Sequence, residues 1–172
     1  MLVARGKHLL FADADGASDI RCLGLLESQL SKIRKSHKAM VVGSRNQVSS
    51  QLTRKRHPLR DFLNACFGFF VKLMCGSDLQ DTQCGFKLFT REAARKLFVA
   101  QHIERWAFDV ELIYLAKILN IPVKEVGINW QEMPGSKVNV LLDSFKIARD
   151  ILVIRLLYTL KLWSPHDTPY CL

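Results

Sequence analysis

The stretch His8-Leu-Leu-Phe-Ala-Asp-Ala-Asp-Gly16 decides the fold, because a short apolar run ends there in two acidic residues and a glycine. The run predicts a buried strand over 8–12, and the residues that follow predict a turn at its carboxyl end. Ligands of open α/β sheets bind outside the carboxyl ends of strands. Asp13 and Asp15 therefore mark a candidate site, since two carboxylates in one turn can face a Mg²⁺ or Mn²⁺ ion that also holds a diphosphate.

The segments after this turn predict an α/β fold. Apolar residues at helical spacing predict a helix that Asp19 caps and that runs to about Ile33, and residues 39–43 predict a second buried strand. This strand, helix, strand order is typical of a parallel sheet. Residues 44–58 are polar and basic and predict a loop. The remaining expected elements are helices over 59–75, 90–98, 109–119 and 143–163 and strands over 86–89 and 126–130.

The composition indicates one globular domain with an anionic partner. The chain has 172 residues, of which 49% are apolar, and 25 basic against 16 acidic residues give a formal charge of +9. Nucleic acid, a phosphorylated ligand and an anionic membrane all fit that charge. The five cysteines are scattered without zinc-ligand spacing, which predicts reduced thiols. The apolar segments 62–75 and 147–163 are interrupted by polar or charged residues, so they predict core or interfacial helices and no transmembrane span.

Three other interpretations of the acidic turn compete. An EF-hand loop fails, because Ala17, Ser18 and Gly24 stand where it needs an oxygen ligand, a glycine and a glutamate. A plain Asp-Gly turn without a ligand is the simplest alternative. The turn also resembles that of the haloacid-dehalogenase-like phosphatases, with Asp13 as nucleophile and Asp15 as acid/base. Against the phosphatase, only about two strands fit before the possible second acidic site at 76–81, where that fold needs more βα units.

Five blocks in register resemble the inverting family 2 glycosyltransferases of the GT-A fold. They are Phe11-Ala-Asp-Ala-Asp-Gly16, Val42-Gly-Ser-Arg45, Asp81-Thr-Gln-Cys-Gly-Phe-Lys-Leu-Phe-Thr-Arg91, Glu104-Arg-Trp-Ala-Phe-Asp-Val-Glu-Leu112 and Gly135-Ser-Lys-Val-Asn139. The resemblance extends over essentially the whole chain. It implies an incomplete GT-A-like (Rossmann-like) mixed sheet flanked by helices, in a single partial domain over 1–172, with amphipathic helices at a membrane surface.

The same resemblance implies a reaction and its partners. The reaction is transfer of glucose, with inversion, from UDP-glucose to dolichyl phosphate for protein N-glycosylation, at the cytosolic face of the endoplasmic reticulum membrane. The cofactor is a divalent metal, Mg²⁺ or Mn²⁺, and the further partner is the membrane surface. Nucleic acid is not expected, because the basic residues are not interleaved with stacking aromatic residues.

The resemblance also implies roles for residues of this sequence. Asp13 and Asp15 hold the metal and the donor diphosphate, and Arg45 and Arg60 receive the acceptor phosphate. The sugar pocket is shaped by Gln83, Gly85 and Phe86. The leaving diphosphate lies at Ser136 and Lys137, and the reacting centre lies near Asp109 or Glu111.

Helical geometry separates the last two of these residues. Asp109 and Glu111 are two positions apart on the expected helix and so diverge, and we expect only Asp109, at the helix start, to face the site. The second pKa of a phosphate monoester is about 6, so the acceptor is already largely dianionic at neutral pH. Asp109 is therefore expected to orient the acceptor or the sugar more than to act as a base.

The family pattern places a nucleotide-binding half and a membrane anchor ahead of the strand that ends at Asp13. Met1 falls just before that strand, so we expect both to be absent and the isolated chain to be inactive and poorly stable. The remaining alternatives are the phosphatase and a catalytically silent module that binds a membrane surface.

Overall fold

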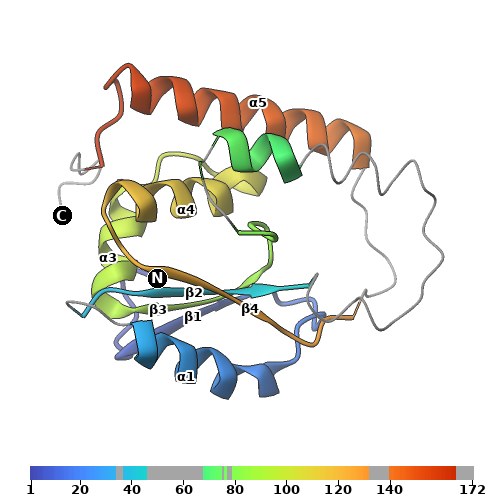
Figure 1. Ribbon diagram of the computed structural model, residues 1–172, viewed down its shortest axis with the longest axis vertical. Helices are drawn as coiled ribbons and strands as arrows, with labels where there is room; N and C mark the ends of the chain where they lie inside the picture. Colours follow the sequence, from blue (N-terminus) through green and yellow to red (C-terminus); the bar gives the residue numbers. More distant parts are fainter. Residues whose placement is uncertain (34–36, 46–67, 75, 77–78, 132–139, 166–172) are drawn as a thin grey trace.

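The computed structural model describes residues 1–33, 37–45, 68–74, 76, 79–131 and 140–165. Within them, four strands form one sheet in the order β1-β3-β2-β4. The strands are β1 (His8–Ala12), β2 (Met40–Ser44), β3 (Phe86–Thr90) and β4 (Val123–Gly127). β3 runs antiparallel to both of its neighbours, whereas β2 and β4 are parallel (Figure 1). The sheet is therefore mixed, as the family resemblance implies.

Helices cover both faces of this sheet (Figure 1). α1 (Leu23–Ile33) lies on one face, and α3 (Arg91–Ala100) and α4 (Phe108–Ile118) lie on the other, with α5 (Val140–Thr159) outside α4. Two apolar clusters result, one around Leu26 and Phe86 beneath α1 and one around Phe89 and Ile113 beneath α3, α4 and α5. Because both faces are covered, all residues of β2 and β3 are buried.

Side chains fix two of the helix starts where the sequence predicts them. Thr90 caps α3, its hydroxyl accepting the Ala93 N–H at 3.3 Å. Asp19 caps the short 3-10 turn η1 (Ile20–Cys22) that leads into α1, accepting the Arg21 N–H at 2.9 Å. Another 3-10 turn, η3 (Arg105–Ala107), leads into α4.

The sheet differs from expectation at two points. The strand, helix, strand order predicts a parallel sheet, but β3 lies between the strands over 8–12 and 39–43 and runs antiparallel to both. The last strand ends at Gly127, not at Trp130, which forms only an isolated antiparallel bridge with Ser18. The alternation of apolar residues continues past the strand because Ile128 stays buried beneath α1 after the chain has left the sheet.

The two expected interfacial helices are described in part. The first falls largely outside the described residues, although 68–74 are helical, and the second corresponds to α5. In the parts of the chain that the structure describes, no helix is both long and apolar enough to cross a membrane.

Candidate active site

The acidic turn follows β1 directly and rests on the residue that precedes β3. The Asp13 N–H donates to the Gly85 carbonyl at 2.9 Å, extending the β1–β3 ladder by one bond. A Cβ at Gly85 would lie only 1.7 Å from the Asp13 Oδ2, so the carboxylate occupies the space that a side chain would need. Asp15 Oδ1 accepts the Ala17 N–H at 2.9 Å, and Gly16 closes the turn with a φ of 74°.

A buried ion pair lies beside this turn. The Lys87 Nζ is 2.7 Å from the Asp109 Oδ1 and also donates to the Cys84 carbonyl. The Lys87 side chain is 0% exposed and that of Asp109 is 11% exposed. Asp109 belongs to the first turn of α4, where the helix dipole favours a negative charge.

The charges of this region act on one another. Burial and the nearby Asp15 raise the pKa of Asp13, and Lys87 and Arg45 oppose that rise. Burial, as the largest cause, and Asp13 raise the pKa of Asp109, whereas Lys87 and Arg45 lower it. The acidic turn, Arg45 and Asp109 therefore lie within electrostatic reach of one another, at the end of the sheet where β1 and β2 terminate.

Arg45 follows β2 and is fixed by a buried carboxylate. Its Nε and Nη2 each lie 2.7 Å from a different oxygen of Asp81, and its own N–H donates to the same carboxylate at 3.0 Å. Glu125 of β4 in turn accepts the N–H groups of Gln80 and Asp81, both at 2.8 Å. The guanidinium also lies 5.6 Å from the centre of the Trp130 ring. These contacts hold the Arg45 charge at the carboxyl end of β2.

Glu111 lies apart from this group of residues. It is fully buried and accepts the N–H groups of His102 and Ile103 and, at 3.0 Å, the hydroxyl of Tyr158. It therefore ties the segment after α3 to α5. Of the two acidic residues at the start of α4, the structure brings only Asp109 next to the acidic turn.

The other predicted site residues are distributed as follows. Gly85 supports Asp13, and Gln83 is partly buried in the turn before β3. Phe86 is 1% exposed and packs in the cluster beneath α1, on the face opposite Lys87. Arg60, Ser136 and Lys137 lie outside the described residues.

The acidic turn suits a hard divalent cation. Among the residues that the structure places, no group of three or more metal-binding side chains occurs. Mg²⁺ is commonly bound by only one or two carboxylates together with substrate phosphates and water. The two carboxylates of the turn therefore fit such an ion with a bound diphosphate, and do not fit an all-protein cage.

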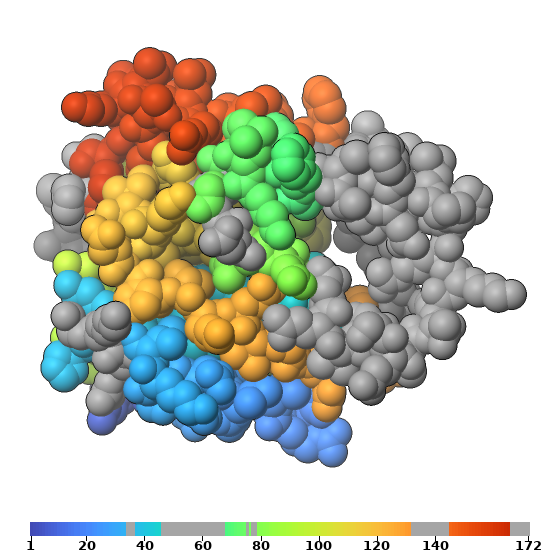
Figure 2. Space-filling view, viewed as in Figure 1, coloured from blue at the N-terminus to red at the C-terminus, as the bar shows by residue number. Residues whose placement is uncertain are grey.

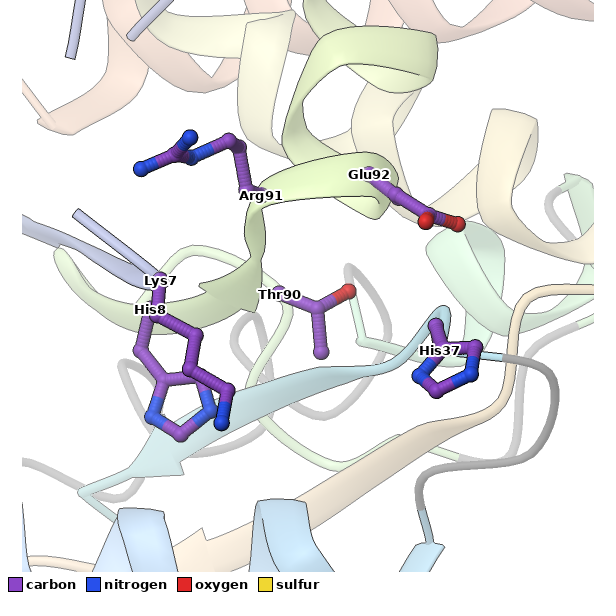
Figure 3. Close-up of a pocket in the computed structure, with 6 residues that line it drawn as sticks. All are labelled: Lys7, His8, His37, Thr90, Arg91 and Glu92. Carbon is purple, nitrogen blue, oxygen red and sulfur yellow. The ribbon is translucent and has the colours of Figure 1, made fainter. Parts of the chain in front are cut away.

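A separate pocket of about 320 Å³ lies at the opposite end of the sheet (Figure 3). Its lining residues are Lys7, His8, His37, Thr90, Arg91 and Glu92. β1 begins and β3 ends there, since His8 pairs with Thr90, whereas Asp13 follows the other end of β1. None of the predicted site residues that the structure describes lines this pocket.

Three residues of the site were not predicted to belong to it. Asp81 and Lys87 stand inside the longest of the quoted blocks, and Lys87 alternates with apolar neighbours, a pattern typical of a side chain that faces solvent. Glu125 carries no local signal, because its partners at 80 and 81 are distant in the sequence.

Known proteins are similar to this chain over most of its length. Residues 1–98 match the model of the family described as glycosyl transferase family 2. A dolichyl-phosphate beta-glucosyltransferase of Dictyostelium discoideum is 48% identical over 165 residues, 95% of this chain and 50% of the relative. Proteins of the same name are 43% identical in Mus musculus (96% of this chain, 52% of the relative) and 38% in Saccharomyces cerevisiae (94% and 51%). The chain spans about half the length of these curated relatives.

Proposed function

The chain belongs to glycosyltransferase family 2, and from this premise we propose that its site serves the transfer of glucose, with inversion, from UDP-glucose to dolichyl phosphate. The observation that carries the proposal is the convergence of the acidic turn, Arg45 and Asp109 at one end of the sheet. The names of the relatives supply the acceptor and the sugar. A dianionic nucleotide diphosphate and a lipid phosphate both suit a site that combines a cation-binding turn with a fixed arginine.

Asp13 and Asp15 are the residues that hold the donor end. A divalent cation bound to them would shield the negative charge of the diphosphate as it departs. Gly85 leaves room for the Asp13 carboxylate and fixes its backbone. The protein contributes a preorganised pair of oxygen ligands, which reduces the reorganisation that the reaction requires.

Arg45 and Asp109 act on the acceptor side. Asp81 holds the guanidinium of Arg45 in place, so its positive charge can attract the acceptor phosphate without first being ordered. An oxygen of that phosphate forms the new bond to the anomeric carbon while the bond from this carbon to the diphosphate oxygen breaks, and UDP leaves. Because the acceptor is largely dianionic at neutral pH, Asp109 needs only to orient the reactants.

A lipid acceptor requires a surface that meets the membrane, and α5 with residues 68–74 provides a candidate. The inner sides of both segments pack into the core, through Val71 and Ile154 among others. Their outer sides expose Phe69, Leu73, Phe145, Leu152 and Leu156. In Figure 2 the two segments lie together at one end of the face shown. Lysines and arginines such as Lys72 and Arg149 accompany these apolar side chains, as at an interface with anionic lipid. We place this surface at the cytosolic face of the endoplasmic reticulum membrane.

The test is a chimera in which this chain replaces the matched half of the Dictyostelium relative. The chimera is expected to transfer radiolabelled glucose from UDP-glucose to dolichyl phosphate in the presence of Mg²⁺ or Mn²⁺. Asp15→Asn and Arg45→Gln are each expected to lower kcat/KM by at least about 100-fold, the scale of losing a charged group that stabilises the transition state.

Two exposed residues provide matched controls. Asp19→Asn and Arg21→Gln make the same chemical changes in a surface ion pair and should leave transfer within about twofold of the parent chimera. A chimera that binds both substrates but transfers no glucose would contradict the proposal. Hydrolysis of p-nitrophenyl phosphate by the chain, lost with Asp13→Asn, would instead favour the phosphatase.

A further inference from the structure

Lys87 is a lysine in the core of the sheet. It belongs to β3, which lies between β1 and β2, and it pairs with Phe11 on β1 and with Val42 on β2. Its side chain is on the face of the sheet that α3 and α4 cover. Its side chain is 0% exposed. Removing an ammonium group from water costs several kcal/mol, so such a residue persists only where specific partners hold it.

The partners of Lys87 connect the sheet to the candidate site. The ammonium group bonds to the Cys84 carbonyl in the turn before β3 and to the Asp109 carboxylate on α4. Asp109 is the more exposed member of the pair, and the acidic turn lies within electrostatic reach of both. Since a buried ion pair rarely stabilises a fold better than two apolar side chains, fold stability alone does not account for it.

We propose that Lys87 is a positioning residue whose ammonium group holds the Asp109 carboxylate toward the acidic turn. The inference deepens the proposed function and rests on it, because Asp109 is useful there only if it orients the acceptor or the sugar. Lys87 touches no substrate in this scheme and acts through Asp109. Its fixed positive charge also offsets the repulsion between Asp109 and Asp13.

The electrostatic consequence can be measured directly. In the part of the chain that the structure describes, the charged groups that act on Asp109 are Lys87 from β3, Asp13 after β1 and Arg45 after β2. Burial and Asp13 raise the pKa of Asp109, and Lys87 and Arg45 oppose that rise. Without the ammonium group, Arg45 is the one described residue that still opposes it, so the carboxyl group should take up its proton at a higher pH.

The experiment titrates Asp109 in the full chain by NMR of ¹³Cγ-labelled aspartate, with the signal assigned by its absence in Asp109→Asn. Lys87→Met is expected to shift the Asp109 midpoint upward by at least about one pH unit, a tenfold change in its ionisation constant. Lys87→Arg keeps the charge and should leave the midpoint close to that of the wild type. In the chimera, the acid limb of kcat/KM should shift upward with Lys87→Met, while KM for UDP-glucose changes by less than about threefold.

Each outcome decides a separate question. An unchanged Asp109 midpoint in Lys87→Met would overturn the inference, whatever the transfer assay shows. A shifted midpoint in a chain whose chimera transfers no glucose would leave the contact established and contradict the proposed function instead. Lys87→Gln, which is neutral but can still donate a hydrogen bond, is the second variant. If Lys87→Met and Lys87→Gln both unfold, Lys87 is a determinant of the fold and the positioning role is refuted.

Discussion

Gly85 lies beneath the Asp13 carboxylate, and its missing side chain is a requirement of the site. A Cβ there would meet the Asp13 Oδ2 at 1.7 Å and Oδ1 at 2.6 Å, and the backbone bond between the two residues prevents them from separating. Gly85→Ala is therefore expected to displace the carboxylate and to weaken Mn²⁺ binding by at least about tenfold, the scale of losing one charged ligand contact. Binding is measured by electron paramagnetic resonance of free Mn²⁺.

Gly24 supplies the matched control on α1. A Cβ at this position would meet no atom within 4 Å. Gly24→Ala should leave Mn²⁺ binding unchanged and raise the free energy of unfolding by about 0.5–1 kcal/mol, because alanine loses less conformational freedom in a helix. Unaltered Mn²⁺ affinity in Gly85→Ala would show that the Asp13 carboxylate does not bind the ion.

Some residues of the site could be predicted from local sequence, and others could not. Asp13 follows a predicted strand, where periodicity changes and the local signal is strong, whereas the roles of Arg45 and Asp109 were expected only from the family resemblance. Lys87 could not be predicted, because a period of two assigns it to one face of a strand without saying what covers that face. Here α4 covers it, and the core pairs it with Asp109.

At the scale of the elements, Glu111 joins α4 to α5 and to the segment after α3. Its buried carboxylate accepts the Tyr158 hydroxyl at 3.0 Å as well as two backbone N–H groups. Tyr158→Phe removes one donor and leaves the charge buried, so we expect the free energy of unfolding to fall by about 1–3 kcal/mol. Urea denaturation measures it, and the transfer rate of the folded chimera should change little. A large loss of kcat without loss of stability would instead place Glu111 in the chemistry.

The outer side of α5 gives a prediction about the membrane. Leu152 and Leu156 are 51% and 56% exposed and lie one helical turn apart. Replacing both by serine should cost little stability and weaken binding to vesicles that contain phosphatidylserine by at least about tenfold, since two apolar side chains would no longer enter the interface. Co-sedimentation with vesicles measures this affinity.

Leu25 on α1 is the control for this prediction. It is 44% exposed and belongs to the helix on the opposite face of the sheet. Leu25→Ser should therefore leave vesicle binding unchanged. An equal loss in both variants would mean that the chain meets lipid without using the outer side of α5.

The order of the strands is the part of the fold that local sequence did not supply. The succession of strand, helix and strand predicts that β1 and β2 are parallel. However, β3 lies between them although it begins 42 positions after Ser44, the last residue of β2. That insertion depends on long-range pairing, which strand propensity does not encode. The insertion of β3 also brings Gly85 and Lys87 next to the acidic turn. The candidate site and the mixed sheet therefore both depend on the pairing of β3 with β1 and β2.

At the scale of the whole molecule, the candidate site is expected to reduce stability at neutral pH. The pKa values of Asp13 and Asp109 are raised in the folded protein, chiefly by burial. A carboxyl group whose pKa rises on folding contributes stability below its unfolded pKa and loses that contribution as the pH rises through its folded value. The folded state therefore carries ionised Asp13 at neutral pH at a cost that a bound cation would offset.

Asp13→Asn tests this balance between stability and function. Without divalent ions at about pH 7.5, the Tm of the variant is expected to lie above that of the wild type, by an amount that solvent screening keeps small because Asp13 is exposed. Adding Mg²⁺ should raise the Tm of the wild type and leave that of the variant unchanged, as differential scanning fluorimetry can measure. Asp19→Asn provides a control of opposite sign, because its hydrogen bonds from Arg21 lower the pKa of Asp19 and its charge supports the fold above the unfolded pKa. A lower Tm for Asp13→Asn in the absence of cations would mean that the charge of Asp13 stabilises the fold. The turn would then be a structural element and not a metal-binding site.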